Sequence, residues 1–293
     1  MAKRRFTEYF AEGPRSFVRA ARRHLRKRNL VRRCRRVIRG KHGLEIGGPS
    51  TTFQSDNLLP IYSAVGQLDN CNFSESTVWE GRLTDGAPFT FDQKKPPGRQ
   101  FIREASDLHG IEENSYDFIL SCHTLEHLAN PLKALEEWKR VLRPSGPLFL
   151  VLPHKDATFD HRRAVTSLAH LVDDYQRTTK EDDLTHLEEI IALHDLARDP
   201  AAPPRPEFDA RCRSNMETRC LHHHAFDTRL VAQLLDRAAF QILALEPMLP
   251  MHIVALARKL SPGESANNKT FLSDRAKHKK RSPFPTDRNN ATL

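Results

Sequence analysis

Two groups of histidine and aspartate residues, far apart in the chain, have the chemistry of general bases and metal ligands. The first group comprises His154, Asp156, Asp160 and His161, and the second is the run His222, His223 and His224. A histidine is suited to remove a proton from a hydroxyl group near neutral pH, and a carboxylate beside it can orient the ring. The same side chains could hold a divalent ion that positions a diol. A plain structural role for the histidine run stays open.

The two groups stand at the borders of residues 154–225, a stretch that separates two apolar segments. Because the borders of an insertion into a sheet return to the same place, we expect the two groups to meet. Pro153 cannot continue a sheet ladder, so the residue after it should project into a cleft. We therefore predict His154 as the catalytic base, with Asp156 or His223 as its orienting partner.

A glycine turn near the start of the chain is a second candidate site. Leu44 to Ile46 form a short apolar segment that is followed directly by Gly47 and Gly48. Glycine allows a sharp turn and a close backbone approach to a ligand, and nucleotide-type cofactors sit at such a turn. Asp69 follows Gly47 by 22 residues, near the ~20-residue spacing of an acid that binds ribose hydroxyls. An ordinary turn after a buried strand would look similar.

The apolar segments predict an α/β fold. We expect strands at residues 41–46, 65–69, 101–103, 116–121, 147–152, 240–245 and 253–257, and helices at 132–142 and 227–238. Strands that alternate with helices form parallel sheets, and ligands bind at the carboxyl ends of such strands.

This order of parts resembles the class I S-adenosylmethionine-dependent methyltransferases, in the large subgroup with a Glu-His-Leu segment after the fourth strand. The resemblance covers residues 41–153, is most specific at Tyr116–Pro153, and resumes weakly at 226–258. It implies a Rossmann-like, doubly wound, mostly parallel sheet with helices on both faces and a helical insertion after the fifth strand. It also implies S-adenosyl-L-methionine as the cofactor; a divalent metal is not favoured but stays open.

The resemblance assigns cofactor-binding roles to individual residues. These are Glu45, Gly47 and Gly48 at the turn, Asp69 at the ribose, Glu104 and Ala105 at the adenine, and Ser121 and His123 under the methionine part. Pro49 and Thr51 depart from the family pattern, since glycine is usual at the first of them and frequent at the second. Glu45 could instead be a strand-end acid and Asp69 a turn former.

Charge and composition divide the chain into five parts. We expect a basic amphipathic arm at 1–40, the cofactor-binding core at 41–153, a substrate lid at 154–225, the end of the core at 226–260, and a disordered basic tail at 261–293. Residues 1–40 hold 15 lysines and arginines against Glu8 and Glu12, a net charge of +13, which leaves −4 of the total +9 for the remainder. The basic character is therefore concentrated on the arm.

The arm favours a helix over residues 14–39 with several possible partners. It could pack on the catalytic domain, lie on an anionic membrane surface, bind nucleic acid, or be a cleaved presequence. No apolar run approaches the ~18–20 residues of a membrane span, and no secretory signal is visible. Five scattered cysteines without a C-x-x-C pair are typical of a reducing compartment. We expect a cytoplasmic protein, peripheral to a membrane if the arm binds lipid.

The sequence favours O-methylation of a small-molecule or glycan-type acceptor, with a histidine base. The alternative is a non-catalytic protein of the same fold that docks on a polyanion through its basic arm. A nicotinamide-dependent oxidoreductase is disfavoured, because residues 47–53 lack the G-x-G-x-x-G pattern. A nucleic-acid acceptor is also disfavoured, because Ser121-Cys122-His123-Thr124 replaces the Asn/Asp-Pro-Pro-aromatic segment of amino-methylating enzymes.

Overall fold

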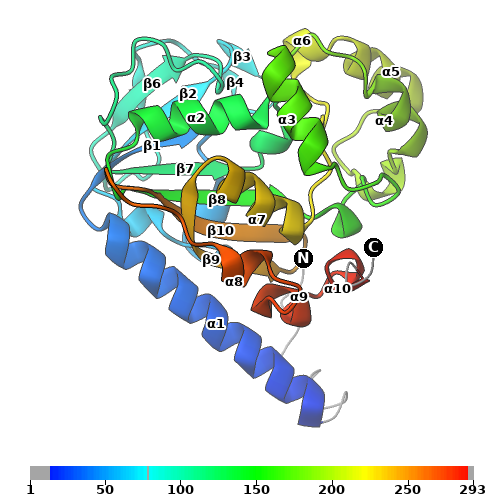
Figure 1. The fold of residues 1–293 in the computed structure, drawn as a ribbon. Coiled ribbons are helices and arrows are strands. Elements are labelled where there is room, and N and C mark those ends of the chain that lie inside the picture. Colours follow the sequence, from blue (N-terminus) through cyan, green and yellow to red (C-terminus); the bar gives the residue numbers. More distant parts are fainter. Residues whose placement is uncertain (1–13, 78, 290–293) are drawn as a thin grey trace.

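The computed structural model describes residues 14–77 and 79–289 and is built on one eight-stranded sheet (Figure 1). The strands lie in the order β5-β6-β2-β1-β7-β8-β10-β9. Their bounds are β1 (His42–Ile46), β2 (Gln67–Asn72), β5 (Pro88–Phe89), β6 (Gly98–Ile102), β7 (Phe118–Cys122), β8 (Pro147–Pro153), β9 (Phe240–Met248) and β10 (His252–Lys259). The five adjacent strands β6, β2, β1, β7 and β8 are parallel to one another. Strand β10 runs antiparallel to both β8 and β9, and β5 runs antiparallel to β6. The predicted fold class is confirmed.

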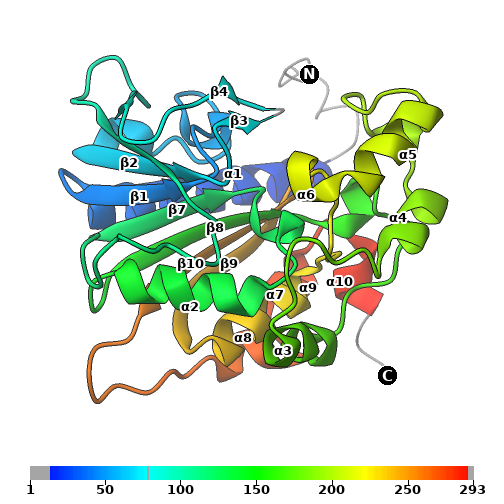
Figure 2. The same ribbon diagram turned by 90° about the horizontal axis from the view of Figure 1, so that it is seen from above.

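Helices cover both faces of the sheet (Figure 2). One face carries α2 (Pro131–Val141) and α7 (Thr228–Arg237), and the other carries α1 (Pro14–Ile38). Helices α2 and α7 each begin at a residue whose side chain accepts a hydrogen bond from a backbone amide of the first turn. Asn130 accepts from Lys133, and Asp227 accepts from Leu230. Strand β7 is buried over its whole length, as expected for a central parallel strand covered on both sides.

Helix α1 is packed on the sheet through its C-terminal part. Leu30, Cys34 and Ile38 are buried at helical spacing, and Arg33 donates to the carbonyl of Leu243 at 2.8 Å. Leu25, earlier in the helix, is 56% exposed. Residues 1–13 of the predicted arm lie outside the described residues. Among the described helices, we find none with the length and apolar character that crossing a membrane requires.

Residues 154–225 form a helical body at the carboxyl ends of the strands (Figure 2). Its helices are α3 (Leu168–Arg177), α4 (Leu187–Leu193), α5 (Arg205–Arg213) and α6 (Asn215–Thr218). A small apolar cluster, which includes Ile190, Phe208 and Leu221, is separate from the two clusters that flank the sheet. A short two-stranded sheet, β3 (Ser76–Thr77) with β4 (Gly81–Arg82), stands near the same end.

The prediction of a disordered tail is wrong for residues 261–289. They form α8 (Lys269–Leu272), α9 (Lys277–Arg281) and α10 (Pro285–Asn289), beside β9 and α7 (Figure 1). Phe284 and Asp287 are buried. Low apolar content suggested disorder, but this segment is held largely by polar contacts to buried groups. Residues 290–293 lie outside the described residues.

Candidate functional site

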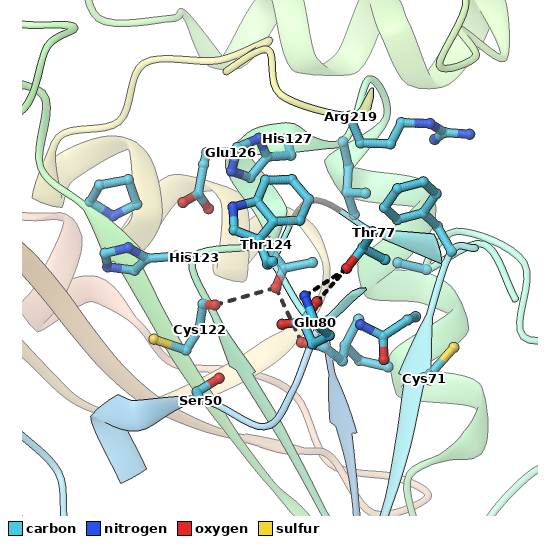
Figure 3. Close-up of a pocket in the computed structure, with 18 of the residues that line it drawn as sticks. Ser50, Cys71, Thr77, Glu80, Cys122, His123, Thr124, Glu126, His127 and Arg219 are labelled. Atoms are coloured by element: carbon cyan, nitrogen blue, oxygen red, sulfur yellow. Dashed lines mark hydrogen bonds between the residues drawn. The ribbon is translucent and has the colours of Figure 1, made fainter. Parts of the chain in front are cut away.

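A cavity of about 520 Å³ lies where the carboxyl ends of five strands meet the insertion (Figure 3). Its wall is formed by the turn after β1, the ends of β2 and β6, the segment after β7, and residues of the insertion that include Phe159 and His222. Trp79 and Glu80, between β3 and β4, also line it. The volume is in the range of small-molecule and cofactor sites.

The glycine turn forms one wall of this cavity. Gly47 has a φ of +78°, which only glycine adopts without strain, and a Cβ there would lie 2.5 Å from the hydroxyl oxygen of Thr124. The backbone N–H of Gly47 donates to the carbonyl of Cys71 at 2.9 Å. The turn therefore brings bare backbone to the cavity, and Thr124, after β7, closes it from behind.

Glu45 and Gly48 hold the turn in place and do not line the cavity. Glu45 is fully buried and accepts hydrogen bonds from the Tyr62 hydroxyl at 2.6 Å and the Ser50 amide at 3.1 Å. Burial raises the pKa of Glu45 to about 7, although these hydrogen bonds oppose the shift. Gly48 exchanges two hydrogen bonds of 2.9 Å with the side-chain amide of Asn70.

Asp69 lies outside the cavity, contrary to prediction, and Asn72 lines it instead. The Asp69 carboxylate accepts from the Arg99 amide at 2.8 Å and the Tyr116 hydroxyl at 2.8 Å. Strand β2 continues three residues beyond Asp69 because Asn72 is buried and its side-chain oxygen accepts from Gln100 at 3.1 Å. The carboxyl end of β2, where a ribose-binding side chain is expected, is therefore Asn72.

Glu104 and Ala105, which directly follow the strand β6 and Arg103, lie in the cavity wall as predicted. Arg219 of the insertion reaches across and donates to both carboxylate oxygens of Glu104, at 2.6 and 3.1 Å. Its guanidinium group also lies 5.1 Å from the centre of the Phe73 ring. This bidentate pair links the insertion to the end of β6 directly over the cavity.

Of the two residues predicted under the methionine part, only His123 reaches the cavity. Ser121 is completely buried within β7. His123 shares a hydrogen bond of 3.0 Å with His252 of β10. Burial and the neighbouring His252 lower the pKa of His123 to about 3, so its ring is neutral at physiological pH.

His154 and Asp156 do not reach the cavity, and their predicted position is wrong. His154 is fully buried, stacks on Phe284 with 4.1 Å between ring centres, and contacts the Asp287 carboxylate at 3.1 Å. Asp156 accepts from the amide and hydroxyl of Thr286, at 2.8 and 2.6 Å. The chain turns away from the cleft after β8 because the ordered C-terminal segment receives both side chains.

The two histidine and aspartate groups do meet, but through Asp160 and His222. His222 lines the cavity, and its Nδ1 lies 2.6 Å from the Asp160 carboxylate. Arg163 donates to Asp160 at 3.0 Å and to the His222 carbonyl at 2.7 Å, which fixes the pair. His223 is buried elsewhere, with Nε2 3.2 Å from the Asn215 side-chain amide. The presence of Asp160 in the first group was the available signal for this pair.

The Asp160 carboxylate controls the charge of His222. Burial lowers the pKa of His222, but the adjacent negative charge and hydrogen bond outweigh it, so the pKa is raised. Conversely, although burial raises the pKa of Asp160, His222 and Arg163 bring it down to about 2. Nδ1 is directed at Asp160, and among the described residues Nε2 of His222, which lines the cavity, has no hydrogen-bond partner.

Glu126 and His127, on the short helix η4 (Leu125–His127), lie beside His222. Figure 3 shows both side chains at the wall of the cavity. His127 Nδ1 contacts the Leu221 carbonyl at 3.0 Å, and among the described residues neither carboxylate oxygen of Glu126 has a hydrogen-bond partner. Ligand atoms of these three residues lie within 4.8 Å of one another. They could hold a divalent ion in the cavity.

Residues 90–150 match a family described as a methyltransferase domain. A probable methyltransferase, ltbC, of Aspergillus luteorubrus is 32% identical over 92 residues, which cover 30% of this chain. The chain spans about a third (32%) of the length of that relative.

Two solved structures are similar over most of the chain. One is a SAM-dependent methyltransferase from Aquifex aeolicus, with a TM-score of 0.41 and 15% identity over 79% of this chain and 89% of that one. The other is a putative S-adenosylmethionine-dependent methyltransferase from Listeria monocytogenes, with a TM-score of 0.43 and 17% identity over 80% of this chain and 97% of that one.

The matched segment, residues 90–150, contains β6, β7, α2 and the start of β8, and thus three of the five parallel strands whose ends form the cavity. The glycine turn follows β1 on one side of β7, and β10 pairs antiparallel with β8 on the other. Residues 90–150 are therefore similar to a methyltransferase domain, and the strand order around them is that of a doubly wound, mostly parallel sheet.

Proposed function

We propose that this protein is a methyltransferase that binds S-adenosylmethionine in the 520 Å³ cavity. The proposal is carried by the turn at Gly47, where bare backbone faces the cavity that the ends of β2 and β6 also enter. The turn would hold the methionine part, Asn72 the ribose hydroxyls, and Glu104 with Ala105 the adenine. When bound, the cofactor supplies an electrophilic methyl group.

Calorimetric titration with S-adenosylhomocysteine tests this proposal. We expect a one-site isotherm that Asn72→Ala weakens by ~1–3 kcal/mol, because ligand hydroxyl groups lose a buried partner. Asp69→Asn is the matched control, since Asp69 lies on the same strand but outside the cavity. Heat with a dinucleotide and none with S-adenosylhomocysteine would contradict the assignment.

We further propose that the reaction is O-methylation with His222 as the base. Nδ1–H of His222 donates to Asp160, which leaves Nε2 as the acceptor for the proton of a substrate hydroxyl. Arg163, 3% exposed, holds the carboxylate and the His222 backbone together, so the ring is oriented before substrate binds. Alignment of an acceptor oxygen and removal of its proton are the two tasks that the chain must perform.

The chain offers a matched control for the base. His161 also pairs with a carboxylate of the insertion, Asp195, at 2.9 Å, but it does not line the cavity. We expect His222→Ala to retain cofactor affinity and to lose ~10²–10⁴-fold in turnover, the usual contribution of a general base, whereas His161→Ala stays near wild type. Equal turnover of the two variants would rule out the base. Cofactor binding without transfer to any hydroxyl acceptor would favour the non-catalytic alternative.

We propose a small-molecule or glycan-type acceptor that enters beneath the insertion, which acts as a lid. Trp79 and Phe159 offer apolar faces, and Arg219 closes one side through its pair with Glu104. Aromatic faces in a concave site suit a planar or sugar-like molecule. Calorimetric titration of candidate acceptors into protein saturated with S-adenosylhomocysteine would identify the class of acceptor that binds.

We propose that α1 contacts an anionic membrane surface. Arg28, Arg32 and Arg36 follow one another at four-residue spacing and are exposed, beside a basic groove of about 790 Å³. Near an anionic bilayer each basic residue contributes ~1 kcal/mol, so their joint replacement by alanine should weaken vesicle binding by about two orders of magnitude. Co-sedimentation with phosphatidylserine vesicles measures this, with phosphatidylcholine vesicles as the control. Equal binding to both would remove the proposal.

A further inference from the structure

A second cluster of metal-ligating side chains lies in the insertion, outside the cavity. His170 and Asp174 lie one turn apart on α3, His186 directly precedes α4, and His224 lies in the segment that returns to the sheet. None of these four residues lines the cavity. We propose that they bind one structural Zn²⁺ ion, which ties the two ends of the insertion together.

The spacing of the ligand atoms fits a tetrahedral ion. Zn²⁺ bonds to histidine nitrogen and carboxylate oxygen are ~2.0–2.2 Å long, so the ligand atoms at the corners of a tetrahedron stand roughly 3.3 Å apart. His170 Nε2 lies 2.9 Å from His186 Nε2 and 3.3 Å from Asp174 Oδ2. His224 Nε2 lies 3.7 Å from the same carboxylate oxygen. Three of the six separations in such a set therefore lie near the tetrahedral edge, and the ligand atoms of the three histidines all lie within 4.8 Å of one another.

The hydrogen-bond pattern leaves this oxygen without a donor. Asp174 is 7% exposed, and its Oδ2 has no hydrogen-bond partner among the described residues, although it faces two histidine rings. A neutral imidazole carries a single N–H group, so His170 Nε2 cannot donate to both His186 and Asp174. A buried carboxylate oxygen without a partner is costly. A bound cation would satisfy the oxygen and the ring nitrogens together.

The surroundings resemble those of a protein metal site. The other oxygen of Asp174 accepts from the Thr179 hydroxyl at 3.2 Å, and Glu189 lies 3.7 Å from the Nδ1 of His186. Ligand residues are commonly held in this way by a second ring of polar groups. The combination of imidazole and carboxylate ligands is typical of Zn²⁺.

Such an ion would fasten the insertion to the core beside the cavity. Asn130, at the start of α2, donates to the Asp174 carbonyl at 3.0 Å, and on binding the ion His224 Nε2 would exchange its 3.3 Å contact with the Ala129 carbonyl for the metal bond. His224 is two residues after His222, whose side chain lines the cavity. The ion would therefore fix the backbone from which His222 projects, without contact with cofactor or acceptor. This inference does not depend on the proposed reaction.

Metal analysis of the untagged full-length protein tests the proposal. We expect about one zinc ion per chain by inductively coupled plasma mass spectrometry. Mutation of a residue that only hydrogen-bonds to a metal ligand weakens metal binding by roughly 10–100-fold. Because His186→Ala removes a ligand itself, it should weaken Zn²⁺ binding by more than this. Zinc should raise the Tm of metal-free wild type and leave that of His186→Ala unchanged. His186 is partly exposed, so its replacement is compatible with folding.

Two control variants locate the ion. His161→Ala removes a histidine of the same insertion that pairs with Asp195 instead, and it should keep the metal. His127→Ala removes a potential ligand of the cavity group and should also keep it. Zinc that is lost in His127→Ala but retained in His186→Ala would overturn the assignment. Wild-type protein that binds no Zn²⁺ added in equimolar amount would overturn it as well.

Discussion

The buried carboxylate of Asp287 is expected to anchor the C-terminal segment to the core. Asp287 is 2% exposed and accepts hydrogen bonds from the amide and hydroxyl of Thr228, at 3.0 and 2.6 Å, and from the Ser282 hydroxyl at 2.6 Å. Its Oδ1 also lies 3.1 Å from His154. One side chain thus connects α10, the start of α7 and the end of β8.

Asp287→Ala should lower the free energy of unfolding by ~3–5 kcal/mol, because several buried groups lose their partner at once. Asp287→Asn should cost less, since the amide keeps one acceptor oxygen and the two hydroxyl groups can rotate to accept. Urea denaturation at pH 7 measures both changes. Asp274→Ala, in the same segment, is the control, because its carboxylate is exposed and forms an ion pair with Lys279 at the surface.

The pH dependence gives a second check. Burial raises the pKa of Asp287, but hydrogen bonding and charge from His154 outweigh it, and the pKa in the folded state is lowered. A lowered carboxyl pKa stabilises the fold above the unfolded-state value of ~3.9, and this contribution is lost as the pH falls below it. The difference between wild type and Asp287→Ala should therefore shrink as the pH falls below about 4. An Asp287→Ala protein within ~0.5 kcal/mol of wild type would refute the anchoring role.

Three further changes test the packing and the site. Ile38→Ala should cost ~2–5 kcal/mol of unfolding free energy because Ile38 is completely buried, whereas exposed Leu25→Ala should be neutral; equal effects in urea denaturation would contradict the packing of α1. The pKa of Glu45 is raised to about 7 by burial. As the pH rises from 4.5 to 7.5, wild type should therefore lose ~3 kcal/mol of unfolding free energy relative to Glu45→Gln. Parallel curves of unfolding free energy against pH for the two proteins would contradict this. Arg219→Ala removes the ion pair with Glu104 and should speed amide hydrogen exchange in α6. Unchanged exchange rates would show that this pair does not hold the insertion in place.

The sequence predicted the central sheet well because its strands are continuous apolar runs. Phe118 to Leu120 and Phe149 to Leu152 are buried and pair side by side as parallel β7 and β8. The end of β2 was placed too early because Asn70 and Asn72 look like loop residues. Both are buried in the strand, where Asn70 and Gln100 bond each other at 2.9 Å. A polar network inside a strand is invisible to hydropathy, since its partner comes from a distant segment.

The same limit explains the error at His154. The sequence shows a histidine after a strand-ending proline, but it does not show that Phe284 and Asp287 return to cover it. Low apolar content predicts disorder on average, and it fails when a few well-placed polar side chains find buried partners. The predicted position of His154 and the predicted disorder of the tail were therefore wrong for one physical reason, the docking of residues 282–289 against the end of β8.

The three consecutive histidines received three different environments. His222 faces the cavity and Asp160, His223 packs against Asn215, and His224 lies in the cluster around Asp174. Successive side chains of a non-helical segment point in different directions, so adjacency in sequence gives no shared function. It does give a shared backbone. A bond that holds His224 restricts the position of His222, and the proposed zinc site would thus affect the proposed base by restraining two intervening peptide units rather than by acting through charge. Loss of zinc should accordingly lower turnover more than cofactor affinity, because the Gly47 turn and the end of β6 belong to the sheet and not to the insertion.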